Sequence, residues 1–163
     1  MNICIGKISK FGVRTKQKEM KPTKKNKEYM RMEPELPCVN EPSSMYLYLK
    51  KPPVNPLIQI LDELISLSDD IISKWLNITT RTFRNYKTNE TEIKENTKEH
   101  IVSILSLYKH GMEVFPTKFE FEKWLTLENP FLDNKAPKDF MSTISGIQFI
   151  DTRLTAMEYG ENV

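Results

Sequence analysis

Three observations on the 163-residue sequence predict an all-α fold. Apolar residues recur at intervals of three and four over several segments, which is the period of a helix face that packs on a core. Serine, threonine and aspartate stand at the start of these segments, where helix caps and acidic first turns are favoured. Apolar residues make up 39% of the chain, which suits one domain of ordinary size or two small ones. No apolar run approaches the roughly 20 residues of a membrane span, so no membrane association is expected.

The first 54 residues are predicted to be a basic, proline-rich, flexible arm. Residues 1–50 hold eleven Lys and Arg against five Asp and Glu, whereas residues 51–163 hold thirteen against seventeen. The cations are densest in residues 7–31, a composition typical of a solvated segment, although clustered cations also suit nucleic-acid phosphates. Both interpretations stay open, and the solvated arm is favoured. Six prolines in residues 34–56 are expected to prevent regular structure before the first helix.

Residues 55–115 are predicted to be a helical domain that contains a helix-turn-helix. Its first helix spans residues 56–67, where the apolar residues follow helical spacing. Ser68 can cap a second, short helix, and Asn77 can end it because asparagine tolerates the left-handed conformation. A third helix follows from Arg81 to about Thr88. A short helix, a turn of three or four residues and a second helix form the spacing of a helix-turn-helix.

The outer face of the third helix is the candidate DNA-binding site. Arginine and asparagine are the residue types that read guanine and adenine edges in the major groove, and threonine and lysine suit phosphates. The candidate residues are Thr79, Thr80, Arg81, Arg84, Asn85 and Lys87. Two alternatives stay open: an arginine of this face could pair with a nearby glutamate, and helix-turn-helix geometry also occurs in proteins that never touch DNA. DNA contact is the favoured interpretation.

A longer helix is predicted over residues 95–112, and it carries both histidines. His100 and His110 are ten positions apart rather than four, so they are not placed as a metal pair, and a surface or rim position is expected for them. No paired carboxylates, Ser/His or Cys/His arrangement or phosphate-binding loop is recognisable. The sequence therefore indicates a binding protein rather than an enzyme, with no cofactor and no metal.

Residues 116–163 are predicted to be a second, small helical domain. Trp124 is its expected core anchor. Apolar residues recur in its last helix at spacings of three, four and three, and this stripe can pack inside the domain or against a second copy, with the first favoured. The stripe consists of Ile147, Ile150, Leu154 and Met157. Five basic and eight acidic residues indicate an acidic surface, which suits a positively charged protein partner.

Five short motifs of this module occur in a characteristic order. They are Trp124-Leu125, Asn129-Pro130-Phe131-Leu132, Pro137-Lys138-Asp139-Phe140-Met141, Thr143-Ile144-Ser145-Gly146 and Tyr159-Gly160. In this series the chain resembles the toxin-binding domain of the Xre/MbcA/ParS antitoxins, and the structural anchors that the resemblance implies are Trp124, Leu125, Asn129, Pro130, Pro137 and Gly146. Residues 76–86 also resemble the helix-turn-helix of that family, with Asn77 in place of a turn glycine. Asp133 and Asn134 stand where the family often has two glycines, and both residue types tolerate turns.

The resemblance implies that the chain is a cytoplasmic antitoxin of a type II toxin-antitoxin pair. Its partner would be a cognate toxin of the NAD-degrading RES type or, alternatively, a ParT-like ADP-ribosyltransferase. The carboxyl end would approach the toxin's active site, where carboxylates can occupy groups that bind NAD phosphates. The implied toxin-binding residues are Tyr159, Gly160, Glu161, Asn162 and Val163. The helix-turn-helix would bind operator DNA as a homodimer and repress the pair's own promoter. The alternative is a stand-alone transcription regulator without a toxin partner.

Overall fold

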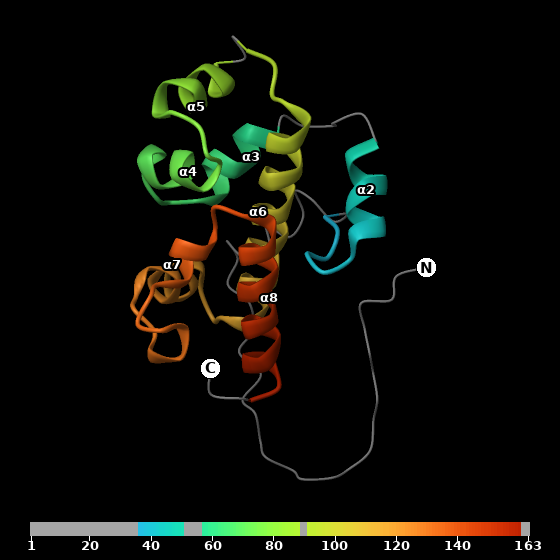
Figure 1. Cartoon of the computed structure of the whole chain (residues 1–163). Helices are drawn as coiled ribbons and strands as arrows, with labels where there is room; N and C mark the ends of the chain where they lie inside the picture. Colours follow the sequence, from blue (N-terminus) through green and yellow to red (C-terminus); the bar gives the residue numbers. More distant parts are fainter. Residues whose placement is uncertain (1–35, 51–56, 89–90, 161–163) are drawn as a thin grey trace.

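The computed structural model describes residues 36–50, 57–88 and 91–160. These residues form seven α-helices and two 3-10 helices, and no strand occurs among them, which confirms the all-α fold (Figure 1). The helices are α2 (Pro42–Lys50), α3 (Leu57–Leu64), α4 (Asp69–Trp75), α5 (Thr80–Lys87), α6 (Glu95–Val114), α7 (Lys118–Thr126), η1 (Pro130–Leu132), η2 (Pro137–Phe140) and α8 (Ile144–Glu158). Within the described ranges, none of the helices combines the length and the hydrophobicity that a membrane span requires.

The long helix α6 is the centre of the molecule. It packs against α2, α3, α7 and α8, so elements from both halves of the chain meet on it (Figure 1). Residues 100–108 are buried one after another, because neighbours surround this part of α6 on every side. The buried apolar residues form one connected cluster that extends from Val39 to Leu154. The cluster contains residues on both sides of the predicted boundary between residues 115 and 116.

Helix α2 lies where the sequence predicted a flexible arm without regular structure, and that prediction is wrong for residues 42–50. Pro42 occupies the first position of the helix, where its missing N–H is not needed. Met45 is buried, and α2 packs against α6. The prediction assumed that every proline prevents a helix, whereas Pro42 starts one. Residues 1–35, with the whole basic cluster of residues 7–31, lie outside the described residues.

Local signals place the other helix ends. Thr79, Thr117 and Thr143 cap α5, α7 and α8, because each hydroxyl accepts a hydrogen bond from the N–H three residues later. Asn77 ends α4 with a φ of 54°, as the sequence predicted. Asp133 and Asn134 have φ values of 55° and 58°, so these residues adopt the left-handed turn that glycines would otherwise supply.

Candidate functional site

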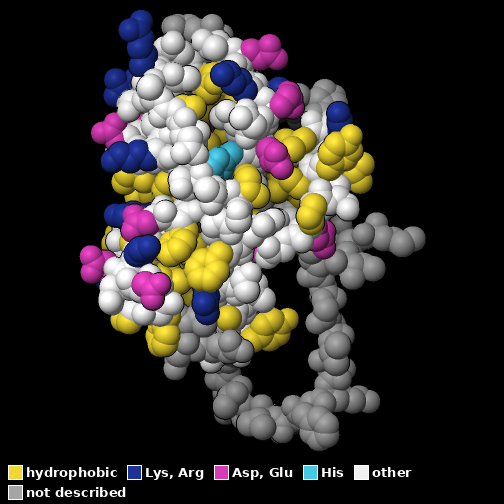
Figure 2. Space-filling model, viewed as in Figure 1, with side chains coloured by type: hydrophobic (Ala, Val, Ile, Leu, Met, Phe, Trp, Pro, Cys, Tyr) yellow, Lys and Arg dark blue, Asp and Glu magenta, His cyan; other side chains and the backbone are white. Residues whose placement is uncertain are grey.

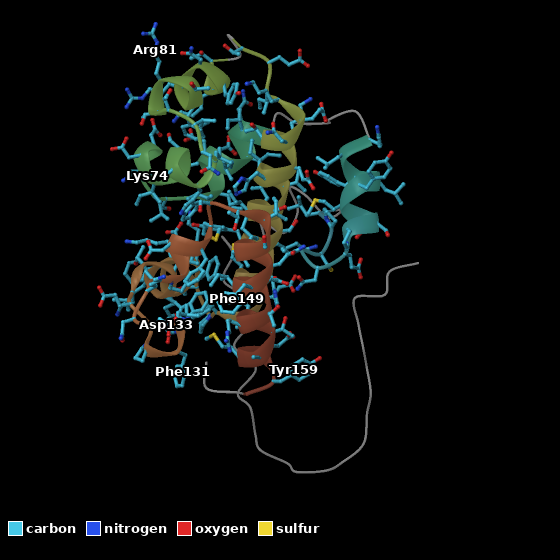
Figure 3. All side chains as sticks on the ribbon, viewed as in Figure 1. Lys74, Arg81, Phe131, Asp133, Phe149 and Tyr159 are labelled. Atoms are coloured by element: carbon cyan, nitrogen blue, oxygen red, sulfur yellow. The ribbon has the colours of Figure 1, made fainter. Side chains whose placement is uncertain are left out.

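The six predicted DNA-binding residues lie together on α5 and at its amino-terminal end. Thr79, Arg81 and Arg84 are exposed, whereas Thr80, Asn85 and Lys87 are partly buried. Arg81 and the exposed Lys74 of α4 point away from the fold (Figure 3). Among the described residues, Arg81 has no ion-pair partner. The order of short helix, turn and short helix is present in α4 and α5, with residues 76–79 as the connection.

Aspartates neutralise the other two cations of this face. Lys87 Nζ lies 2.9 Å from Asp62 Oδ1 and 3.0 Å from Asp69 Oδ1, and Arg84 Nε lies 3.2 Å from Asp69 Oδ2. The hydrogen bond from Lys87, helped by Arg84, lowers the pKa of Asp69 against the opposing effect of burial. Burial by itself would lower the pKa of Lys87, but the two aspartates raise it overall. The sequence analysis left open that an arginine of this face pairs with a glutamate. The structure shows that Arg84 and Lys87 pair with aspartates of α3 and α4 instead.

Side chains of the first half of the fold donate hydrogen bonds to backbone carbonyls in and just after η2. Trp75 Nε1 donates to Lys138 O over 2.9 Å, and Asn77 Nδ2 donates to Ser142 O over 2.7 Å. His100 Nε2 lies 2.8 Å from Met141 O, so this nitrogen carries the proton. These hydrogen bonds connect α4, the α4–α5 turn and α6 to the segment that precedes α8.

The surface or rim position predicted for the histidines is wrong for His100. Its side chain is buried, because the ring lies between α6 and the carbonyl of Met141. Desolvation by burial lowers the pKa of His100. His110 is partly buried, and a hydrogen bond from its Nδ1 to Asp151 raises its pKa. No group of three or more potential metal ligands exists among the described residues.

The predicted anchors of the C-terminal module lie in its core, at the starts of its 3-10 helices and at a close backbone approach. Leu125 is fully buried, whereas Trp124 is partly buried and stacks on Phe121, which fills the centre in its place. The Asn129 side chain accepts a hydrogen bond from Phe131 N over 2.9 Å. Three further anchors complete the set: Pro130 opens η1, Pro137 opens η2 and is buried, and Gly146 leaves no room for a Cβ beside the carbonyl of Phe140.

Two acidic residues of this module lie inside the protein, so the surface is less acidic than the composition predicted. Glu122 is 9% exposed and accepts a hydrogen bond from Ser66 N, and Asp151 is 6% exposed. Asp151 accepts bonds from Asn40 Nδ2 over 2.6 Å and from His110 Nδ1 over 2.7 Å. These carboxylates bind groups of the chain itself, so the composition overstates the negative charge that a partner would meet.

The C-terminal module instead exposes large apolar side chains. These are Phe119, Leu127, Phe131, Phe149 and Tyr159, and Tyr159 is 78% exposed. Figure 2 shows apolar side chains on the lower half of the face in view, and Figure 3 places Phe131, Phe149 and Tyr159 there. The sequence analysis missed Phe131 and Phe149 as contact candidates, because phenylalanine in a helical module is normally assigned to the core. The apolar stripe of α8 packs inside the molecule, as favoured: Ile147, Ile150 and Leu154 are fully buried.

Of the predicted toxin-binding residues, the structure describes Tyr159 and Gly160. They follow α8 directly, and Gly160 has a φ of 84°, a left-handed conformation that ends the helix. Residues 161–163 lie outside the described residues. The exposed ring of Tyr159 is at the end of the molecule opposite Arg81 (Figure 3).

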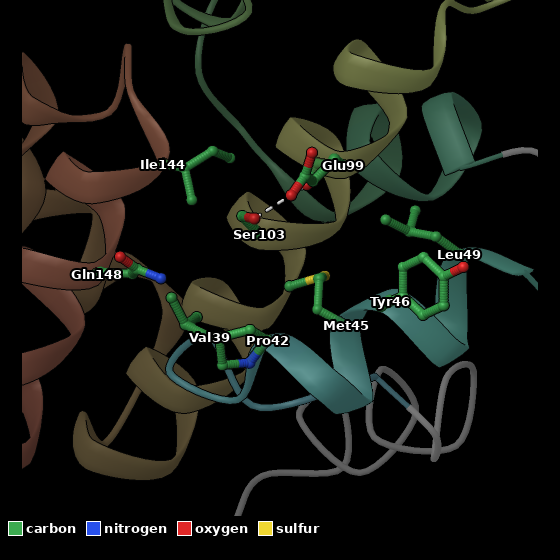
Figure 4. A pocket seen from close by; sticks show the side chains of 9 residues that line it. All are labelled: Val39, Pro42, Met45, Tyr46, Leu49, Glu99, Ser103, Ile144 and Gln148. Carbon is green, nitrogen blue, oxygen red and sulfur yellow. Dashed lines mark hydrogen bonds between the residues drawn. The ribbon is translucent and has the colours of Figure 1, made fainter.

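A small pocket lies between α2, α6 and α8 and has a volume of about 170 Å³. Its walls are mainly apolar, with Val39, Met45 and Ile144 among them (Figure 4). The polar groups are Glu99, Ser103 and Gln148, and the Ser103 hydroxyl donates to the backbone carbonyl of Glu99.

These features describe a helical module with exposed apolar side chains at the carboxyl end of the described residues, packed against a charged helical pair. Residues 110–160 match the family model of the antitoxin Xre/MbcA/ParS C-terminal toxin-binding domain. The match covers the last turn of α6 and all of α7, η1, η2 and α8, and it confirms the resemblance inferred from the five motifs. No curated protein matches the chain. The match supports an antitoxin role and a toxin as partner.

Proposed function

We propose that this chain is the antitoxin of a type II toxin-antitoxin pair and neutralises its toxin by direct binding. The match of residues 110–160 to a toxin-binding domain is the observation that carries the proposal. A protein of this kind acts by binding and regulation rather than by catalysis, and it works in the cytoplasm. The cognate toxin is a RES-type enzyme that degrades NAD, with a ParT-like toxin as the alternative; both follow from the family resemblance.

The toxin contacts the lower end of the molecule through Tyr159 and Gly160, together with the residues 161–163 that follow them. The 78% exposure of Tyr159 supports this placement, since a large amphipathic ring is a favourable anchor in an interface. Phe131 and Phe149 extend the apolar area on the same face (Figure 3). The Glu161 carboxylate would then bind cationic groups of the toxin's NAD pocket.

The α4–α5 pair acts as a helix-turn-helix that binds operator DNA as a homodimer and represses the promoter of the toxin-antitoxin pair. The exposed Arg81, which lacks an ion-pair partner among the described residues, supports this assignment. A second candidate function, a stand-alone transcription regulator, rests on the same helices. It differs from the first in having no toxin partner.

Co-expression tests the antitoxin role. The product of the adjacent reading frame is expressed alone and with this chain, and growth and cellular NAD are followed. We expect the product alone to stop growth and deplete NAD, and this chain to restore both and to co-purify with it. A harmless neighbour, or toxicity that persists in the presence of this chain, would favour the stand-alone regulator.

A matched pair of variants locates the contact. Tyr159→Ala removes an exposed tyrosine after α8, and Tyr46→Ala removes one of 61% exposure on α2. We expect Tyr159→Ala to weaken rescue and co-purification and Tyr46→Ala to leave both intact. Deletion of residues 161–163 tests the carboxylate contact separately. Unchanged inhibition after that deletion would exclude the pocket-filling role and leave the docking of α8 in place.

A further inference from the structure

Asp69 binds both cations in the second half of α5, but the two pairs differ in kind. Lys87 bridges Asp69 of α4 and Asp62 of α3, lies over the Phe83 ring at 5.2 Å and has a side chain that is 26% exposed. It therefore joins three helices and is held in place. The Arg84 side chain is 67% exposed, and Asp69 is its ion-pair partner among the described residues. An exposed pair of this kind is weak, so a stronger anion can displace the carboxylate.

Carboxylates also surround the cations on this face. Asp69 and Asp70 lie in the first turn of α4, where the Asp70 carboxylate accepts a hydrogen bond from the Thr80 hydroxyl over 2.8 Å. DNA phosphates that approach α5 would be repelled by these carboxylates, and the phosphates would compete with Asp69 for Arg84. Arg81 faces no such competitor among the described residues.

We propose that Asp69 is an internal competitor for Arg84 and lowers the affinity of α5 for DNA, which leaves Arg81 as the main cationic contact. The inference rests on the proposed DNA binding by α4 and α5. It assigns three roles on one helix: Arg81 contacts DNA, Arg84 is withheld by Asp69, and Lys87 is structural. Affinity is then set by a residue of α4 that need not touch DNA.

The test measures binding of the full chain to a fluorescent duplex from the region upstream of its gene, by anisotropy at several salt concentrations. Asp69→Asn releases Arg84 and is expected to tighten binding by about 1.4-fold to fivefold, the range of an exposed ion pair. The slope of log K against log salt should steepen by about one, since one more phosphate is contacted. Asp70→Asn is the matched control, because it removes a charge from the same turn without releasing an arginine.

Arg84→Gln distinguishes the release of Arg84 from a general loss of negative charge. In the wild-type background we expect Arg84→Gln to change DNA affinity less than twofold. In the Asp69→Asn background it should abolish the gain and restore the original salt slope. Asp69→Glu keeps a carboxylate in reach of Arg84 and should retain weak binding. Urea unfolding of each variant verifies that the fold is unchanged.

Two results would overturn the inference while DNA binding by α5 stands. The first is Asp69→Asn binding the duplex no tighter than Asp70→Asn, and the second is Arg84→Gln weakening binding as much in the wild-type background as in the Asp69→Asn background. In either case Arg81→Gln should still weaken binding. If no protein in the series binds the duplex, the inference fails together with the proposed DNA-binding role. The toxin-neutralising role is tested separately by co-expression.

Discussion

Asn77 allows the backbone and the side chain of the α4–α5 turn to be perturbed separately. Its φ of 54° is left-handed, and its Nδ2 donates to Ser142 O over 2.7 Å, a contact between residues 65 positions apart. Asn77→Gly keeps the turn conformation and deletes the hydrogen bond. Asn77→Ala deletes the same bond, keeps the Cβ and loses the short polar side chain that makes the left-handed conformation tolerable for asparagine.

The two substitutions should differ in their cost. A single hydrogen bond contributes about 0.5–1.5 kcal/mol to stability, and the exposed position of this one favours the lower half of that range. Asn77→Gly should therefore reduce the free energy of unfolding by about 0.5–1 kcal/mol. Relative to glycine, alanine in the left-handed region costs a further amount of about 1–2 kcal/mol. For Asn77→Ala we thus expect a total loss of about 1.5–3 kcal/mol.

Urea unfolding followed by far-UV circular dichroism measures both losses against the wild-type chain. For a protein of this size, 1 kcal/mol corresponds to a shift of about 2–4 °C in Tm, so thermal scans can verify the order of the variants. If Asn77→Gly is as stable as the wild type, the bond to Ser142 contributes nothing. If Asn77→Ala is as stable as Asn77→Gly, the left-handed assignment is wrong.

Three further predictions follow from the core. Gly146→Ala should cost about 2–3 kcal/mol in urea unfolding, because its Cβ would collide with the carbonyl of Phe140, whereas Ser145→Ala in the same turn should cost much less. The Asp151 hydrogen bond raises the pKa of His110, so this pair contributes its full stabilisation below about pH 6.5. The contribution is lost as the pH rises through the raised pKa of His110. Over that pH range, the difference in free energy of unfolding between the wild type and His110→Gln should shrink. An unchanged difference would contradict this pairing. Residues 116–163 expressed alone should show no cooperative thermal transition, since α8 packs on α6; a cooperative transition would show that the module has a core of its own.

Local chemistry in the sequence predicted most of the helices. Thr79 caps α5, and Asn77 ends α4 in the conformation expected of it. Ser68 stands at the predicted start of α4, but its side chain makes no capping hydrogen bond. These features depend on interactions within four residues, which a sequence displays directly. Helix α2 was missed because its stability depends on burying Met45 against α6, a contact between distant segments.

The hydrogen-bond and ion-pair partners of charged and polar groups could not be predicted from the sequence. Composition counts Glu122 and Asp151 as surface charge, yet the fold places both inside, where Ser66, Asn40 and His110 supply hydrogen bonds. A buried carboxylate requires such partners, and they come from segments far away in the chain. The same limitation applies to Arg84: its neighbours in sequence did not identify Asp69 as its partner.

The shared core has a geometric consequence for the proposed function. Trp75, Asn77 and His100 bond to the carbonyls of residues 138, 142 and 141, so the α4–α5 pair has a fixed position relative to the segment that precedes α8. Arg81 and Tyr159 nevertheless lie at opposite ends of the molecule (Figure 3). DNA on α5 and a toxin at the end of α8 would then not compete for the same surface. An influence of one on the other would pass through contacts such as these three hydrogen bonds, the bond from Ser66 to Glu122 and the α6 core, since a coupling between sites requires a physical connection that both can bias.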